Sequence, residues 1–284
     1  MEHGIPSRTA LRVAMRRAAH QMYDARPLVF EDPLAISILG PHAAELDRTP
    51  GRNLLHKPRP FSVSLRAFLV ARSRYAEDLL APAVEGGVTQ YVLLGAGLDT
   101  FAHRNPYPGL RVFEVDHPAT QQWKRELLQS IGLPAPANLV YAPVDFEHQT
   151  LGEELHPAGF DPAAPSFFAW LGVVPYITLT AFRATIAFIA AQPPGSGVVF
   201  DYGQPRAVLP ALEQLAQDSL ASRVQLAGES FKLFFTPAEV AAELAAFRDR
   251  EDLGSAQINA RYFGHRHDGL KVLGSAGRLV SAWL

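Results

Sequence analysis

Apolar residues recur at two different spacings along the chain, and the change in spacing divides it into two parts. In the first part they recur every three or four residues, which predicts amphipathic helices over 7–23 and 62–80. An Asp-Pro pair at the start and a glycine at the end predict a short helix over 32–40. The polar, proline- and glycine-rich stretch 41–60 is expected to be a mobile loop. Together these segments predict a helical N-terminal cap over 1–84.

Beyond this cap the apolar residues form short continuous runs. Five runs are spaced as strands are in βαβ units, at 91–94, 111–115, 139–144, 166–171 and 198–202. Runs that are apolar throughout, without alternation, are typical of parallel strands covered on both faces. We therefore predict an α/β fold in which 85–284 form a doubly wound, mostly parallel, Rossmann-like sheet domain. A helical insertion is expected at about 206–228.

Helix signals lie between and after these runs. Capping residues and a final glycine predict helices over 117–132 and 178–191, and a capping box predicts another over 236–247. Two more apolar runs, at 256–263 and 270–284, are candidates for the last strands.

The composition and charge of the 284-residue chain exclude several classes of function. The absence of cysteine excludes disulfides, thiolate zinc sites and thiol nucleophiles. With a net charge of -2, the chain has no excess of positive charge for binding the phosphates of nucleic acid. No apolar run approaches the ~20 residues that a membrane span needs. Arginines interrupt the first apolar residues, so no signal peptide is expected. The sequence predicts a cytoplasmic enzyme with a small-molecule substrate, and it leaves the oligomeric state open.

The first predicted strand ends in a glycine turn that suits a nucleoside ligand. Gly95 and Gly97 allow the backbone to turn sharply and to approach a ligand closely. Asp116 follows the second strand, 21 residues beyond Gly95, where a carboxylate can accept hydrogen bonds from both ribose hydroxyls. The three residues predict an adenosine-cofactor pocket at the carboxyl ends of the strands.

The residues after the turn favour a cofactor without phosphates. A dinucleotide site would have a third glycine leading into a long helix, whereas this chain has Thr100 followed by Pro106 and Pro108. S-adenosylmethionine fits this pattern better than NAD, although an NAD-dependent oxidoreductase stays open as an alternative.

Two motifs at this turn carry a resemblance to a known family. The segments 94–100 (LGAGLDT) and 113–118 (FEVDHP) resemble the leucine carboxyl methyltransferase family, closest to its bacterial branch, which includes polyketide carboxyl O-methyltransferases. The resemblance covers nearly the whole chain, including Asp32-Pro33, 71–74, 200–202 and 259–263. It implies a class I methyltransferase fold and S-adenosylmethionine as cofactor.

The resemblance also implies roles for particular residues. Arg72 corresponds to the arginine that pairs with the methionine carboxylate of the cofactor, with Arg74 as an alternative match. Gly95 and Gly97 then lie near the methionine half and Asp116 near the ribose. Asp145 and Phe146 correspond to the pair that faces adenine. One residue departs from the family pattern: Leu171 stands where members often carry a glutamate, five residues before Tyr176.

Candidates for catalysis and substrate binding follow from position along the chain. Tyr176 and Tyr202 follow the fourth and fifth strands and are candidate catalytic residues, each weighed against a place in the core. His20, Tyr23 and Arg261 are candidate substrate-binding residues. The arginine- and histidine-containing stretch 261–267 has no carboxylate or third histidine spaced to complete a metal site, so no metal is expected.

The first helix is locally basic, since Arg8, Arg12, Arg16 and Arg17 meet few acids nearby in the sequence. These arginines are interpreted first as a solvated helix face, with a basic cap that attracts anionic substrates as the alternative. A carboxylate acceptor would need no general base at neutral pH, whereas a phenol or alcohol would need one. We predict an O-methyltransferase that acts on a carboxylate of a small acidic molecule or a peptide terminus. The alternatives are methylation of a phenol or alcohol, and cofactor binding without catalysis.

Overall fold

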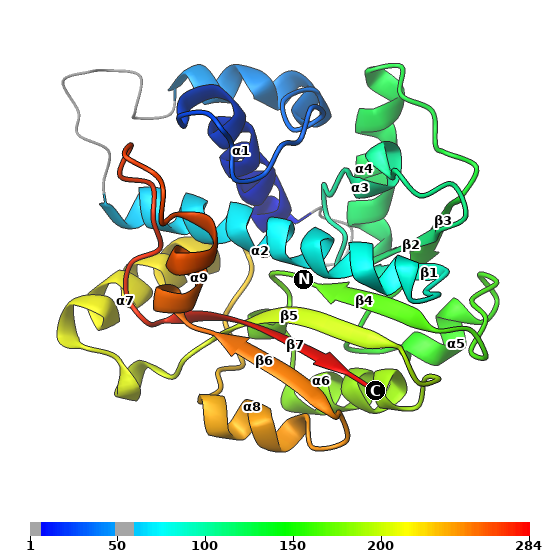
Figure 1. The fold of residues 1–284 in the computed structure, drawn as a ribbon. Helices are drawn as coiled ribbons and strands as arrows, with labels where there is room; N and C mark the ends of the chain where they lie inside the picture. Colours follow the sequence, from blue (N-terminus) through cyan, green and yellow to red (C-terminus); the bar gives the residue numbers. More distant parts are fainter. Residues whose placement is uncertain (1–6, 49–59) are drawn as a thin grey trace.

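A single sheet organises the part of the chain that the computed structural model describes, residues 7–48 and 60–284. Seven strands of these residues pair in the order β3-β2-β1-β4-β5-β7-β6 (Figure 1). Their bounds are β1 (Gln90–Leu94), β2 (Arg111–Asp116), β3 (Leu139–Pro143), β4 (Ser166–Trp170), β5 (Gly197–Gly203), β6 (Asp249–Leu253) and β7 (Gly277–Trp283). Strands β1 to β5 are parallel, whereas β7 is antiparallel to both β5 and β6. The predicted α/β fold with a mostly parallel sheet is confirmed, as are its first five strands.

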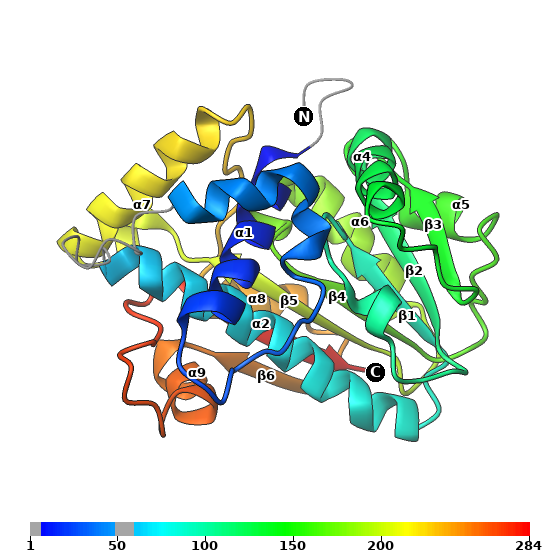
Figure 2. The same cartoon turned by 90° about the horizontal axis from the view of Figure 1, so that it is seen from above.

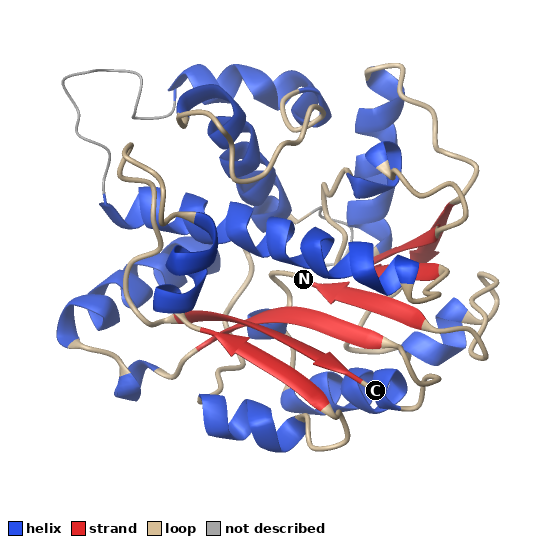
Figure 3. Ribbon diagram, viewed as in Figure 1, coloured by secondary structure: helices blue, strands red, loops and turns tan. Residues whose placement is uncertain are grey.

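Helices precede, connect and follow these strands (Figure 3). They are α1 (Arg8–Tyr23), η1 (Ser37–Arg48), α2 (Pro60–Glu85), α3 (Phe101–Arg104), α4 (Pro118–Ser130), α5 (Leu151–Leu155), η2 (Val174–Tyr176), α6 (Leu179–Ala190), η3 (Arg206–Val208), α7 (Ala211–Gln225), α8 (Pro237–Glu243) and α9 (Ser255–Tyr262), where η marks a 3₁₀ helix. The predicted caps are present: Thr178 accepts a hydrogen bond from the Ala181 N–H, and Thr236 forms a capping box with Glu239. Among the described helices, none has the length and apolarity that a bilayer crossing demands.

Successive residues of a strand point to opposite faces of the sheet, and each face is covered by a different set of helices. Val92 and Leu94 of β1 belong to a core cluster with α5, α6 and α8. Tyr91 and Leu93 belong to a second cluster with α2 and α9. Helix α2 runs across the sheet and is therefore one layer of its core (Figure 2).

Helices α1, η1 and α4 pack together in a third cluster that includes Leu98 of the glycine turn. Of the predicted cap, only the α1 and η1 part lies in this cluster, since α2 shares its core with the strands. The first helix is thereby held against the loop that follows β1, where the functional site is expected.

The structure corrects three predicted elements. Residues 256–263, expected as a strand, form helix α9, in which Gln257 accepts the Gly254 N–H and Ile258 is buried. The strand in this region is β6, whose sequence DREDL is polar because it lies at the sheet edge. The expected helix over 32–40 is a turn followed by η1, in which Gly40 (φ 52°, ψ -129°) forms a kink between two helical segments, the second of which ends at Arg48. Of the expected loop, 41–48 are helical and 49–59 lie outside the described residues.

Candidate active site

A cavity of about 370 Å³ lies at the carboxyl ends of the parallel strands, a volume typical of a small-ligand site. Its walls come from the glycine turn after β1, the ends of β2 and β3, the loop after β4 and one face of α1. Arg72 of α2 and the segment 228–232 complete it. Of the predicted site residues, it brings together seven: Arg72, Gly95, Gly97, Asp116, Asp145, Phe146 and Tyr176.

The glycine turn has a shape that other residues could not adopt without strain. Gly95 and Gly97 have φ angles of 69° and 49°, in the left-handed region. A Cβ atom at Gly95 would lie 2.2 Å from Cγ2 of Val173, and one at Gly97 would lie 3.1 Å from Cβ of Ala10. The turn is therefore packed between the loop after β4 and helix α1.

Asp116 closes this turn from the end of β2. Its carboxylate accepts hydrogen bonds from the backbone N–H of Gly97 at 2.5 Å and of His117 at 2.7 Å. Burial raises the pKa of Asp116 to about 6, although these two N–H groups act in the opposite direction. A carboxylate so placed can still accept hydrogen bonds from a ligand hydroxyl.

Arg72 enters the cavity from α2. Its Nη1 lies 3.0 Å from Asp201 Oδ2, and both side chains are buried. The Nε atom of Arg72 is buried and has no hydrogen-bond partner among the described residues. Arg74, the alternative match, is exposed and pairs with Asp78 at 2.7 Å, so the structure places Arg72 in the site.

The end of β3 forms the rim of the cavity. Asp145 accepts the Glu147 N–H at 3.1 Å and lies 3.0 Å from Nδ1 of His148. Lys232 pairs with Glu147 at 3.1 Å, which joins this rim to the segment after α7. On the other side Ser7 donates a hydrogen bond to Glu229 at 2.8 Å. Two polar links therefore connect the segment 228–232 across the cavity mouth.

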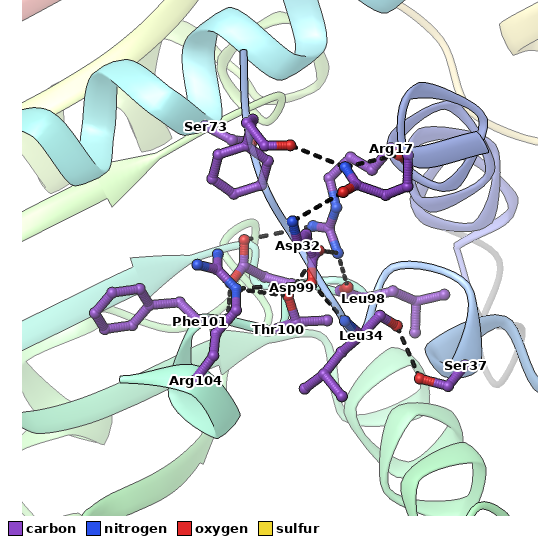
Figure 4. Close-up of polar contacts among 12 residues, drawn as sticks. Arg17, Asp32, Leu34, Ser37, Ser73, Leu98, Asp99, Thr100, Phe101 and Arg104 are labelled. Carbon is purple, nitrogen blue, oxygen red and sulfur yellow. Dashed lines mark hydrogen bonds and ion pairs between the residues drawn. The ribbon is translucent and has the colours of Figure 1, made fainter. Parts of the chain in front are cut away.

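A buried network ties α1 to the glycine turn (Figure 4). Arg17 donates a hydrogen bond to the Leu98 carbonyl at 2.8 Å and pairs with Asp32 at 3.1 Å and Asp99 at 3.5 Å. Burial alone would raise the pKa of Asp99, but Arg17 and Arg104 together lower it. Arg17 is not among the site residues predicted from the sequence. The helical spacing of Ala10, Ala14 and Arg17 was the available signal, since it places Arg17 on the buried stripe of α1.

Tyr176 lies in the cavity wall, and its ring centroid is 5.2 Å from that of Phe231. Burial and the nearby Glu229 raise the pKa of the Tyr176 phenol, so its hydroxyl stays protonated at neutral pH and can donate a hydrogen bond. Leu171 also lines the cavity and gives it an apolar surface at this point.

The structure places two predicted residues of the C-terminal half elsewhere. Tyr202 is buried in the core on the opposite face of β5 and donates a hydrogen bond to Asp252 at 2.7 Å. Arg261 forms an exposed bidentate pair with Glu251 at 2.7 and 3.0 Å. Neither side chain lines the cavity, so the predicted catalytic role of Tyr202 and substrate-binding role of Arg261 are not supported there.

The two candidates on the first helix also point away from the cavity. His20 is fully buried between Asp24, 2.7 Å from its Nδ1, and the Phe30 N–H. Tyr23 is exposed at the end of α1 and donates to the Leu46 carbonyl at 3.4 Å. His20 continues the buried stripe of α1 beyond Arg17, past the end of the cavity, and Tyr23 lies in the exposed last turn, so position on this helix was an insufficient guide.

Comparisons with known proteins agree with this geometry. The family model described as "Leucine carboxyl methyltransferase" matches residues 10–190. The chain is 32% identical over 288 residues to a Bacillus subtilis (strain 168) protein named "Putative S-adenosyl-L-methionine-dependent methyltransferase YktD", covering 94% of each chain.

Two solved structures share the fold at 16% sequence identity. A "putative methyltransferase" from Thermobifida fusca YX superposes with a TM-score of 0.57, covering 99% of this chain and 96% of the other. A DUF574 family protein from Streptomyces avermitilis MA-4680 gives a TM-score of 0.53, covering 96% of each chain.

Proposed function

The chain belongs to the leucine carboxyl methyltransferase family of S-adenosylmethionine-dependent enzymes, and on that basis we propose that it methylates a carboxylate of a small acidic molecule. The observation that carries the proposal is the cavity at the strand ends. It combines a glycine turn, a hydrogen-bond-accepting Asp116 and the buried cation of Arg72 beside a protonated Tyr176.

The cavity fits the cofactor chemically. Gly95 and Gly97 line the cavity, so a ligand there can approach their backbone, and Asp116 can accept hydrogen bonds from ribose hydroxyls. The buried Nε–H of Arg72 has no partner in the described part of the chain, as expected of a donor that binds a ligand carboxylate. Bound S-adenosylmethionine supplies a methyl group on a positively charged sulfur.

The protein's task in this reaction is to hold the acceptor in line with that methyl group. Orientation of this kind can lower a barrier by as much as ~7–11 kcal/mol. In this proposal Tyr176 of the cavity wall donates a hydrogen bond to one acceptor oxygen while the other stays free to react. A carboxylate is ionised at neutral pH and needs no base, which matches a tyrosine that acts as a donor.

Leu171 in the cavity wall suggests what kind of acceptor the cavity binds. An apolar side chain in this wall contributes no charge that would repel an acidic molecule. We therefore expect the acceptor to be an anion with an apolar portion that packs on Leu171.

The test uses the purified protein, S-adenosylmethionine labelled in the methyl group, and matched panels of carboxylic acids and phenols. A methyl ester releases labelled methanol in mild alkali, whereas a methyl ether keeps its label. We expect alkali-labile product from acids, and alkali-stable product from phenols alone would overturn the carboxylate assignment. Calorimetry with S-adenosylhomocysteine and NAD provides the cofactor control, with binding expected only for the former.

A further inference from the structure

We propose that Arg16, together with Arg12 and Arg223, forms a binding site for an additional anionic group of the methyl acceptor, a carboxylate or a phosphate. The inference deepens the proposed function and rests on it for the identity of the acceptor. It assigns the acceptor two anionic ends: one that receives the methyl group and one that these arginines bind.

The position of Arg16 places it beside the reaction site. Ala10, Val13, Ala14 and Arg17 form the stripe of α1 that lines the cavity, and Arg16 directly precedes Arg17. Arg16 does not line the cavity itself. Arg12 of the same helix donates to the Arg223 carbonyl of α7, and α7 is followed closely by the segment 228–232 of the cavity wall. The three arginines therefore lie on two elements that border the cavity.

Within residues 7–48 and 60–284, no ion pair joins any of the three guanidinium groups to an acid. In the described part of the chain their contacts are with backbone carbonyls: Arg16 donates to Arg12 at 3.2 Å, Arg12 to Arg223 at 2.8 Å and Arg223 to Ser219 at 3.1 Å. No carboxylate of the described residues lies within 4.0 Å of them.

Neighbouring arginines are paired differently. Arg17 pairs with Asp32 and Asp99, Arg66 with Asp24 and Arg72 with Asp201. Arg12, Arg16 and Arg223 therefore differ from these three arginines in contributing positive charge that no described carboxylate offsets.

This arrangement has an energetic cost that an anion would reduce. Arg16 is half-buried, and burial together with repulsion from Arg223 and Arg12 lowers its pKa to about 10. Like charges held together without a counter-charge destabilise the folded protein, as is common at binding sites. A carboxylate or phosphate can accept two hydrogen bonds from one guanidinium, so it would neutralise the cluster with defined geometry.

Anion binding can be measured without the natural acceptor. Inorganic phosphate and glutarate are each titrated into the protein saturated with S-adenosylhomocysteine, and binding is followed by calorimetry and thermal unfolding. We expect saturable binding of at least one anion, weakened at least tenfold in Arg16→Gln and partly restored in Arg16→Lys. The relative affinities of phosphate and glutarate distinguish the two kinds of anionic group.

Arg183→Gln is the matched control, because Arg183 is an exposed arginine of α6 paired with Glu243. It should bind the anion as the wild type does. Without anion, Arg16→Gln should have a Tm equal to or above that of the wild type, because the substitution removes repulsion. Undiminished binding by Arg16→Gln, or no binding of either anion by the wild type at millimolar concentration, would overturn the proposal.

Steady-state kinetics distinguish a failure of this proposal from a failure of the proposed function. With an acceptor found in the acid panel, Arg16→Gln should raise KM at least tenfold for a dicarboxylate or phosphocarboxylate and change kcat little. Its KM for the matching monocarboxylate should stay within twofold of the wild-type value. Equal effects on both acceptors would contradict the second site and leave carboxyl methylation standing, whereas anion binding without any methyl transfer would contradict only the proposed function.

Discussion

Arg72 and Asp201 form a buried ion pair that joins helix α2 to the end of strand β5, with Nη1 of Arg72 3.0 Å from Oδ2 of Asp201. The second oxygen of Asp201 accepts the backbone N–H of Gly172 at 2.6 Å. A Cβ atom on Gly172 would lie 2.6 Å from Nη2 of Arg72, so the guanidinium rests directly on this backbone. Arg72, the proposed cofactor-binding arginine, is thus held by the charge of Asp201 on one side and by the backbone of Gly172 on the other.

Replacing Arg72 by lysine should weaken S-adenosylhomocysteine binding by about 10- to 100-fold, because lysine keeps the charge and loses the planar fork. Arg72→Met should weaken it further and also destabilise the protein, since Asp201 would stay buried without its cation. Calorimetry measures both affinities. Arg74→Ala is the control, and an equal loss in that variant would contradict the assignment of Arg72.

Gly95→Ala should destabilise the protein more than Gly132→Ala does. Both glycines have a φ of 69°, so both substitutions carry the left-handed strain of about 1–2 kcal/mol. Only at Gly95 would the new Cβ meet another atom, at 2.2 Å from Val173, which adds about 1–3 kcal/mol of crowding. Urea unfolding checks the difference, and equal free energies of unfolding would show that the turn accommodates a side chain.

Cofactor affinity should depend on the protonation of Asp116. Its pKa in the folded protein is raised to about 6 from 3.8, so the folded state holds a proton between pH 4 and 6 that the unfolded state has lost. This group's contribution to stability therefore decreases as pH rises through that window.

Ribose hydroxyls need the ionised form of Asp116 as acceptor, so S-adenosylhomocysteine should bind about tenfold more weakly at pH 5 than at pH 7. Asp116→Asn should bind weakly at both pH values and lose this dependence. Calorimetry across pH 5–8 tests the expectation, which fails if the variant keeps the wild-type slope.

Tyr176→Phe should lower activity and leave stability unchanged, whereas Tyr202→Phe should lower stability and leave activity unchanged. Tyr176→Phe removes a donor in the cavity wall and should lower kcat/KM at least tenfold with little change in Tm. Tyr202→Phe removes a hydrogen bond to Asp252 in the core and should cost about 1–2 kcal/mol of stability with kcat/KM unchanged. Kinetics and thermal unfolding of the two variants together test the roles, and a kinetic defect confined to Tyr202→Phe would reverse them.

The parts of the fold that depend on a local pattern of residues could be predicted from the sequence. The strands β1 to β5 are continuous apolar runs because helices cover both of their faces. Strand β6 was missed because an edge strand can be almost entirely polar, as its sequence DREDL is. The glycine turn and Asp116 could be predicted because their spacing follows directly from the βαβ unit.

The tertiary pairs of the site were beyond sequence reasoning. Asp201 and Tyr202 are adjacent on β5 and point to opposite faces, so the order of residues alone did not show which one faces Arg72. The pairing of Arg17 with Asp32 and Asp99 likewise depends on how α1 packs on the turn.

The hydrogen bond from Arg17 to the Leu98 carbonyl couples the displacement of α1 to the opening of the glycine turn. Because α1 both lines the cavity and holds the glycine turn through this contact, displacing the helix would also release the backbone of the proposed cofactor site. Native-state hydrogen exchange should therefore find the amides of the turn and of α1 opening together, as one cooperative unit. Product exchange would then proceed at the rate at which this unit opens, with helix and turn moving as one gate.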